Sequence, residues 1–202
     1  MTAIEIGRLL RSSTTGCVIG CRVSQLDAPA FGGMVRIPLP DGYQIYGLMY
    51  DIRIDDDGLV RHLVTAEGIP EDVILDNRNN RSVPVEISVL FVGYETGGRV
   101  SHLLPPRPPL TLDSIFPCSA VELCRFTAAG RFGYFRHVLR AADLPVGELL
   151  AAHLQMAHQA HCDSGNTSWG VQATQELITL LRDDYPTLMS VLGALGDAQI
   201  AL

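Results

Sequence analysis

The stretch VPVEISVLFVGYE, residues 83–95, decides the fold class of this chain. Its side chains alternate between two faces, with Glu86 and Ser88 on one face and a row of apolar residues on the other. The apolar row consists of Val83, Val85, Ile87, Val89 and Phe91. Alternation with a period of two residues is typical of a β-strand that buries one face. The stretch therefore predicts a long strand against a hydrophobic core.

Similar stretches occur on both sides of it. MVRIPL (34–39) and YQIYGLMYDIRI (43–54) alternate in the same way, and TTGCVIGCRV (14–23) and LVRHLVTA (59–66) are further strand candidates. In the second of these stretches we expect one apolar face, formed by Tyr46, Leu48, Tyr50, Ile52 and Ile54. Turn signals lie between the candidates, at residues 32–33, 40–42, 55–58 and 97–98. We expect β-structure from residue 4 to about 126, with a long polar loop at 67–82.

Short strands at this spacing, without a helical period between them, indicate an antiparallel barrel or sandwich. A six-stranded barrel is the more economical choice, because closure removes exposed strand edges. SHLLPPRPPLTLDSIFP (101–117) resembles a polyproline ligand, but its flanks are apolar and strand-like. We interpret it as an internal corner that carries the chain across the barrel to the last strand.

From about residue 131 the apolar period becomes helical. Candidate helices cover 132–141, the residues after Pro145, 166–184 and 186–202. The sequence thus predicts an α+β chain, with a β-barrel domain at 1–127 and a helical domain of three or four short helices at 128–202. AAGRFG (128–133) is the expected junction.

Composition narrows the possible functions. Hydrophobic residues make up 47% of the 202 residues, the net charge is −7, and all 15 basic residues are arginine. This composition is typical of a globular protein, and the acidic balance argues against direct nucleic-acid binding. The sequence contains neither an apolar leader nor a run of apolar residues that could span a membrane. An odd count of five cysteines is typical of a reducing compartment, so we expect a cytoplasmic protein that does not bind membranes.

No catalytic or cofactor-binding motif stands out. The sequence lacks GxxxxGK[ST] and lacks GxGxxG between a strand and a helix, and Asp55-Asp56-Asp57-Gly58 suits a solvated turn. The alternative is a metal site or enzyme in the segment His153–Asp163, with His158, His161 and Cys162 as ligands. However, His153 and His161 lie on the apolar helical stripe, which favours a role in the core.

Several of these stretches together resemble the HerA–ATP synthase barrel family, or HAS barrels. The likeness covers residues 4–127, and its motifs are IGRLLRSSTTGCVIGCRV, FGGMVRIPL, YQIYGLMYDI, VEISVLFVGY and HLLPPRPPLTLDSIFPCSAVELCRF. In HerA-type DNA translocases this barrel precedes a RecA-like ATPase and docks a nuclease such as NurA. Helical sequence stands here in place of a P-loop domain, so the resemblance implies a stand-alone barrel and carries over no ATPase activity.

The prediction from sequence is therefore a non-enzymatic assembly or docking module without a cofactor. We expect it to form homo-oligomers or to bind a protein partner such as a HerA-type ring ATPase or a DNA-processing complex. The alternative remains a metal-binding protein or enzyme that uses the segment His153–Asp163.

Overall fold

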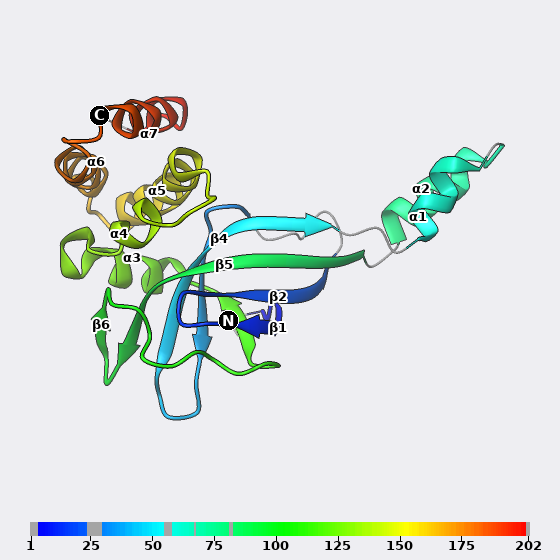
Figure 1. Cartoon of the computed structure of the whole chain (residues 1–202), viewed down its shortest axis with the longest axis horizontal. Helices are drawn as coiled ribbons and strands as arrows, with labels where there is room; N and C mark the ends of the chain where they lie inside the picture. The colour runs from blue at the N-terminus through cyan, green and yellow to red at the C-terminus, as the bar shows by residue number, and fades with distance from the viewer. Residues whose placement is uncertain (1–3, 24–29, 55–57, 67, 81–82, 201–202) are drawn as a thin grey trace.

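The computed structural model describes residues 4–23, 30–54, 58–66, 68–80 and 83–200. Its N-terminal part is a closed antiparallel barrel of six strands, which confirms the predicted fold (Figure 1). The strands follow the order β2-β1-β7-β3-β4-β5, and pairing of β2 with β5 closes the barrel. Their bounds are β1 Gly7–Ser12, β2 Gly16–Val23, β3 Met34–Pro38, β4 Gln44–Ile54, β5 Val83–Thr96 and β7 Ser114–Pro117. A short strand, β6 Arg99–Ser101, pairs with β5 outside the closed ring.

Side chains fill the inside of the barrel. Val85, Ile87, Val89 and Phe91 of β5 point inward, as predicted, and the two cysteines of β2 pack beside them as small hydrophobes. The buried interior consists of Leu9, Cys17, Ile19, Cys21, Val35, Ile37, Ile45, Met49, Val85, Ile87, Val89, Phe91 and Ile115. Burial raises the pKa of the Cys17 thiol to about 12. The barrel interior is thus a packed core and not a ligand chamber.

Helices cover the outside of the barrel at one end (Figure 1). They are α3 Ala120–Ala128, the short 3-10 helix η1 Gly130–Phe132, α4 Phe135–Leu139, α5 Val146–Asp163, α6 Trp169–Leu180 and α7 Tyr185–Asp197. The helices after residue 128 confirm the predicted helical C-terminal part. A second hydrophobic cluster joins these helices to Met34, Tyr46, Leu48 and Val92 of the barrel. The helices therefore share a core with the outer surface of β3, β4 and β5.

Strand β4 is buried on both faces over its first half, which the expectation of a half-buried strand missed. Tyr46 and Leu48 belong to the cluster with the helices, whereas Ile45 and Met49 point into the barrel. The predicted apolar face is therefore the outer one at this end of the strand. This second apolar face is explained by tertiary packing. The helical layer covers the outer surface of β4, which would be polar in a barrel exposed to solvent.

Three predictions inside the β-region were wrong. LVRHLVTA forms a helix, α1 Leu59–Thr65, and the expected loop at 67–82 contains α2 Glu71–Asn80. The apolar positions 59, 60, 63 and 64 recur four residues apart, which is a helical spacing, so the sequence contained a helix signal that the strand prediction overlooked. The stretch expected to close the barrel after residue 117 forms α3, which starts with a capping box between Ser119 and Glu122. Asp55, Asp56 and Asp57 lie outside the described residues.

The proline-rich stretch connects β6 to β7, and β7 lies between β1 and β3. It therefore crosses the barrel, which confirms the predicted corner. Ser12 Oγ donates a hydrogen bond of 2.5 Å to the carbonyl oxygen of Pro109, and Arg107 forms an ion pair with Asp41. None of the helices in the described ranges has the length and apolar character needed to cross a membrane.

A polar network ties the barrel to α3. Glu95 of β5 accepts hydrogen bonds from the Tyr46 hydroxyl and from Arg125, both at 2.7 Å. Gln44 and Arg125 in turn donate to the Tyr46 oxygen. Burial, followed by the hydrogen bond to Glu95, raises the pKa of Tyr46 to about 12. The buried Tyr46 hydroxyl therefore donates its proton to the Glu95 carboxylate.

Candidate functional site: an exposed arm and a basic groove

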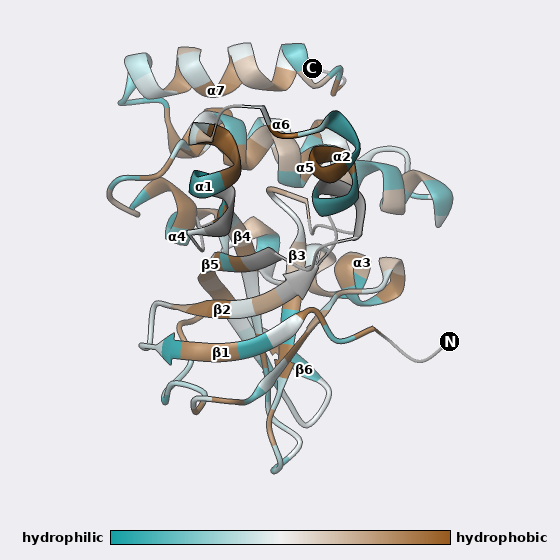
Figure 2. Ribbon diagram, turned by 90° about the vertical axis from the view of Figure 1, so that its right-hand side faces the viewer, coloured by the Kyte–Doolittle hydropathy of each residue, from teal (hydrophilic) through white to brown (hydrophobic). Residues whose placement is uncertain are grey.

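Helices α1 and α2 extend away from the barrel, and we call them the arm (Figure 1). They stand between β4 and β5 in the chain, and none of the arm's side chains that the structure describes belongs to either hydrophobic cluster. Its apolar side chains are exposed by 77% at Val64, 39% at Val73, 47% at Ile74 and 49% at Leu75. Figure 2, in which the arm points toward the viewer, shows hydrophobic colour on α2. Apolar side chains gathered on a projecting element make the arm a candidate interaction surface.

Acidic side chains stand beside these apolar ones. Glu71 and Asp72 occupy the first turn of α2, where a negative charge interacts favourably with the helix dipole. Glu71 precedes Ile74 by three residues and Leu75 by four, so the three share one face of the helix. The arm thus presents a surface that combines carboxylates with branched aliphatic groups. Such a surface is complementary to an apolar depression with a basic rim.

Two adjoining hollows lie where the barrel meets the helices, with volumes of about 310 and 520 Å³. Thr15, Tyr50 and Leu90 line both, so the two hollows adjoin, and we call them together the groove. Its other apolar lining residues include Val89, Phe91, Leu104 and Leu144, and its basic ones are Arg11, Arg136, His137 and Arg140. None of the described residues that line the groove is acidic, although the chain carries a net charge of −7.

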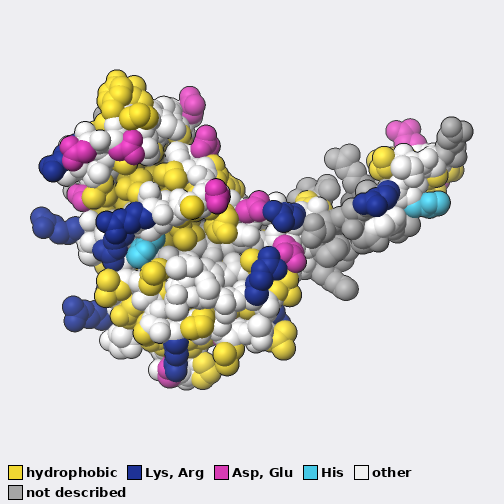
Figure 3. Space-filling view, in the orientation of Figure 1, with side chains coloured by type: hydrophobic (Ala, Val, Ile, Leu, Met, Phe, Trp, Pro, Cys, Tyr) yellow, Lys and Arg dark blue, Asp and Glu magenta, His cyan; other side chains and the backbone are white. Residues whose placement is uncertain are grey.

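The basic residues of the groove differ in how they are held. Arg136 donates a hydrogen bond to the carbonyl oxygen of His102, and Nε2 of His137 lies 2.8 Å from the same oxygen. Burial lowers the pKa of His137, although its bond to that carbonyl opposes the shift. Arg140 is exposed and forms no ion pair with any residue that the structure describes. In Figure 3, arginine side chains gather beside a histidine near the level where helices meet the barrel.

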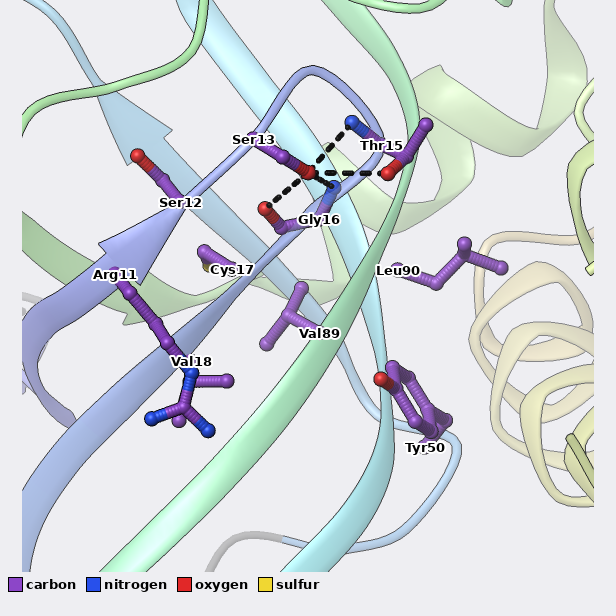
Figure 4. A pocket seen from close by; sticks show the side chains of 10 residues that line it. All are labelled: Arg11, Ser12, Ser13, Thr15, Gly16, Cys17, Val18, Tyr50, Val89 and Leu90. Atoms are coloured by element: carbon purple, nitrogen blue, oxygen red, sulfur yellow. Dashed lines mark hydrogen bonds between the residues drawn. The ribbon is translucent and has the colours of Figure 1, made fainter. Parts of the chain in front are cut away.

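The turn between β1 and β2 borders the groove on the other side (Figure 4). Ser13 Oγ accepts hydrogen bonds from the backbone N–H groups of Thr15 and Gly16, each at 3.2 Å. The backbone N–H of Ser13 donates to the carbonyl of Gly16 at 2.8 Å. These donors are used within the turn and do not form a cradle for a phosphate group. Ionic recognition in the groove therefore depends on its arginine side chains.

The histidines at the two ends of the predicted metal segment lie in the core of the helical region. His153 is fully buried on α5, and its Nε2 lies 3.1 Å from the Tyr134 hydroxyl. Burial lowers the pKa of His153 to about 4, so it is neutral at pH 7. His161 lies 2.8 Å from Thr127 Oγ1 and stacks on Trp169 with ring centroids 4.6 Å apart. These contacts and the burial of both histidines confirm their interpretation as core residues.

The candidate metal ligands come together only as a pair. The sulfur of Cys162 lies 3.6 Å from Nε2 of His158, whereas His161 turns toward Thr127 and Trp169. Among the described residues, no group of three or more His, Cys, Asp or Glu side chains is arranged to hold a metal ion. Of the three candidate ligands, only His158 and Cys162 are therefore within contact distance of each other.

Sequence reasoning missed both the arm and the groove. The arm could have been found from EDVILD (71–76), which places aliphatic residues between carboxylates inside an apparent loop. The groove has no sequence signal, because its walls come from separate parts of the chain. A search of known family models and of curated proteins finds no match for this chain, so its function has to be inferred from geometry.

Proposed function

We propose that the protein is a non-enzymatic assembly and docking module of the HAS-barrel type. It forms homo-oligomers or docks on a protein partner such as a HerA-type ring ATPase or a DNA-processing complex. The observation that carries this proposal is the arm, which exposes Ile74 and Leu75 to solvent on an element outside both hydrophobic clusters. Exposed aliphatic groups on a projecting helix are stabilised when a partner covers them.

The interior of the barrel supports the same role. Ile19, Ile87 and Phe91 are fully buried within it, so the barrel provides a rigid base for the arm and leaves no room for a substrate. The groove adds a second surface of complementary character. The Ser13 hydroxyl in the lining of the groove bonds to Thr15 and Gly16 within its own turn, so no catalytic base activates it.

The setting that we propose is the cytoplasm. The five cysteines are all free, in accord with a reducing compartment. We propose no membrane contact and no direct nucleic-acid contact, since the net charge of −7 disfavours binding to phosphate backbones. A link to DNA processing would then pass through the protein partner.

The test measures assembly of the full chain. Light scattering after size exclusion gives the mass of the protein alone and in a mixture with a purified HerA-type ring ATPase. We expect a homo-oligomer or a complex with the ATPase, and we expect loss of either when Ile74 and Leu75 are both replaced by serine. A protein that stays monomeric and does not co-elute with the ATPase would overturn the proposal.

A matched control separates docking from general loss of surface hydrophobicity. Val121 on α3 is 78% exposed and lies outside the arm, so Val121→Ser removes a comparable apolar group elsewhere. The control should assemble as the unchanged protein does. Equal loss in the control and in the arm variant would mean that assembly does not depend on the arm.

A further inference from the structure

We propose that the groove is the receptor for the arm of a second copy of this chain. The inference rests on the proposed docking function and adds to it the identity of one partner and its binding site. Two surfaces of complementary character occur on the same molecule. The following observations connect them.

The first observation is the match of charge. The lining of the groove contains Arg136 and Arg140 and no acidic residue. The exposed face of α2 begins with Glu71 and Asp72. A basic rim and an acidic helix start attract each other, and the match favours this occupant over a basic or neutral one.

The second observation is the match of apolar groups. Leu104 at the edge of the groove is 38% exposed, and Tyr50, Leu90 and Leu144 are only partly buried. The arm offers Ile74 and Leu75 beside Glu71 on the same helical face. A helix that places aliphatic side chains into a hydrophobic depression, with charges at the rim, is a common mode of recognition between proteins.

The third observation is the placement of the two surfaces. The arm leaves the barrel at Ile54 and Val85 and points away from the helical layer that walls the groove (Figure 1). In this arrangement the arm of one molecule lies clear of its own groove and is available to another. An interface between different patches on two copies is heterologous, and it forms rings or filaments when it repeats.

The test uses charge reversal on each side. Arg140→Glu changes the groove and Glu71→Arg changes the arm, and both residues are exposed, so neither change places a charge in a hydrophobic core. Sedimentation velocity over a range of protein concentrations measures self-association. We expect each variant alone to associate at least about tenfold more weakly than the unchanged protein, because the reversal brings like charges together.

The decisive sample is a mixture of the two variants. The Arg140→Glu chain retains an acidic arm and the Glu71→Arg chain retains a basic groove, so the mixture should regain association that neither variant shows alone. Combining both substitutions in one chain should also restore association. Arg182→Glu is the matched control, because its side chain is 74% exposed and lies outside the groove. It should associate as the unchanged protein does.

Several results would overturn the inference. They are a monomer at all concentrations, equal effects of Arg140→Glu and Arg182→Glu, or a mixture that stays monomeric. Closure of the arm onto the groove of its own chain would give a monomer and is excluded by the same measurement. One result separates the two proposals. If the chain does not self-associate but still binds the ATPase, and this binding requires Ile74 and Leu75, the docking function is supported and the binding of the arm to a second copy is refuted.

Discussion

Replacing Glu95 with alanine tests the junction between the barrel and α3. Glu95 accepts from the Tyr46 hydroxyl and from Arg125, each at 2.7 Å. The Arg125 side chain is 49% exposed, so its ion pair contributes at most about 1 kcal/mol after solvent screening. The Tyr46 hydroxyl is buried, and losing its acceptor costs about 1–3 kcal/mol. Arg125 cannot replace that acceptor, because a guanidinium only donates, and Gln44 presents its amide N–H to the Tyr46 oxygen in this structure.

We therefore expect Glu95→Ala to lower the free energy of unfolding by about 3 kcal/mol at pH 7. Urea denaturation followed by circular dichroism measures the change. The control is Glu5→Ala, which breaks a well-exposed ion pair with Arg8 and should change stability by about 0.5 kcal/mol or less.

A double-mutant cycle identifies the cause. If the unpaired hydroxyl is the main cost, Tyr46→Phe should be much less harmful in the Glu95→Ala background than in the unchanged protein, with a coupling energy of about 1–2 kcal/mol. A loss below about 1 kcal/mol for Glu95→Ala, or strictly additive effects of the two changes, would refute this reasoning.

Four further predictions follow from the same structure. Burial lowers the pKa of His153 from its ordinary 6.5 to about 4. As the pH falls, the unfolded chain therefore takes up the proton before the folded chain does. The stability that neutral His153 contributes is complete above pH 6.5 and falls by about 3 kcal/mol as the pH drops to about 4. Urea unfolding at several pH values should show a weaker acid loss in His153→Gln. Gly93→Ala places a Cβ 2.5 Å from the Ser101 carbonyl oxygen and should cost about 1–3 kcal/mol by thermal denaturation, whereas Gly196→Ala, with open space around it, should not destabilise. Replacing residues 58–80 with a short Gly–Ser linker should shift the midpoint of thermal unfolding by only about 4 °C or less, because the arm is outside both cores. Treatment with a chelator should leave that midpoint unchanged, since His161 turns away from His158 and Cys162.

The barrel could be predicted because its strands carry their own signal. In β5, the residues Val85, Ile87 and Val89 alternate with polar neighbours, and the inward row follows from that period alone. The helices α5, α6 and α7 were also predictable, since apolar residues at helical spacing follow a helix-start signal such as Pro145. In each case the local pattern and the tertiary environment agree.

Prediction failed where the pattern was short or the environment was remote. In the segment 59–65 the four-residue spacing of the apolar side chains was overlooked, as was the capping box at Ser119 beside an apparent strand pattern. The burial of Tyr46 on the outer face of β4 depends on helices about eighty residues later, so no local signal contains it. The groove depends on the same remote packing.

The placement of the arm in the chain has a mechanical consequence. Both ends of the arm continue into adjacent strands, β4 and β5, which pair from Ile54 and Val85 inward. A pull on the arm along the strands therefore loads both in the same direction, and the force is resisted by their ladders with β3 and β2. These ladders, which run from Met34 to Pro38 on one side and from Gly16 to Val23 on the other, are loaded in shear, so many hydrogen bonds share the force at once. A pulling force on the arm is thus transmitted into the barrel through both strands together, without separating the strands one hydrogen bond at a time.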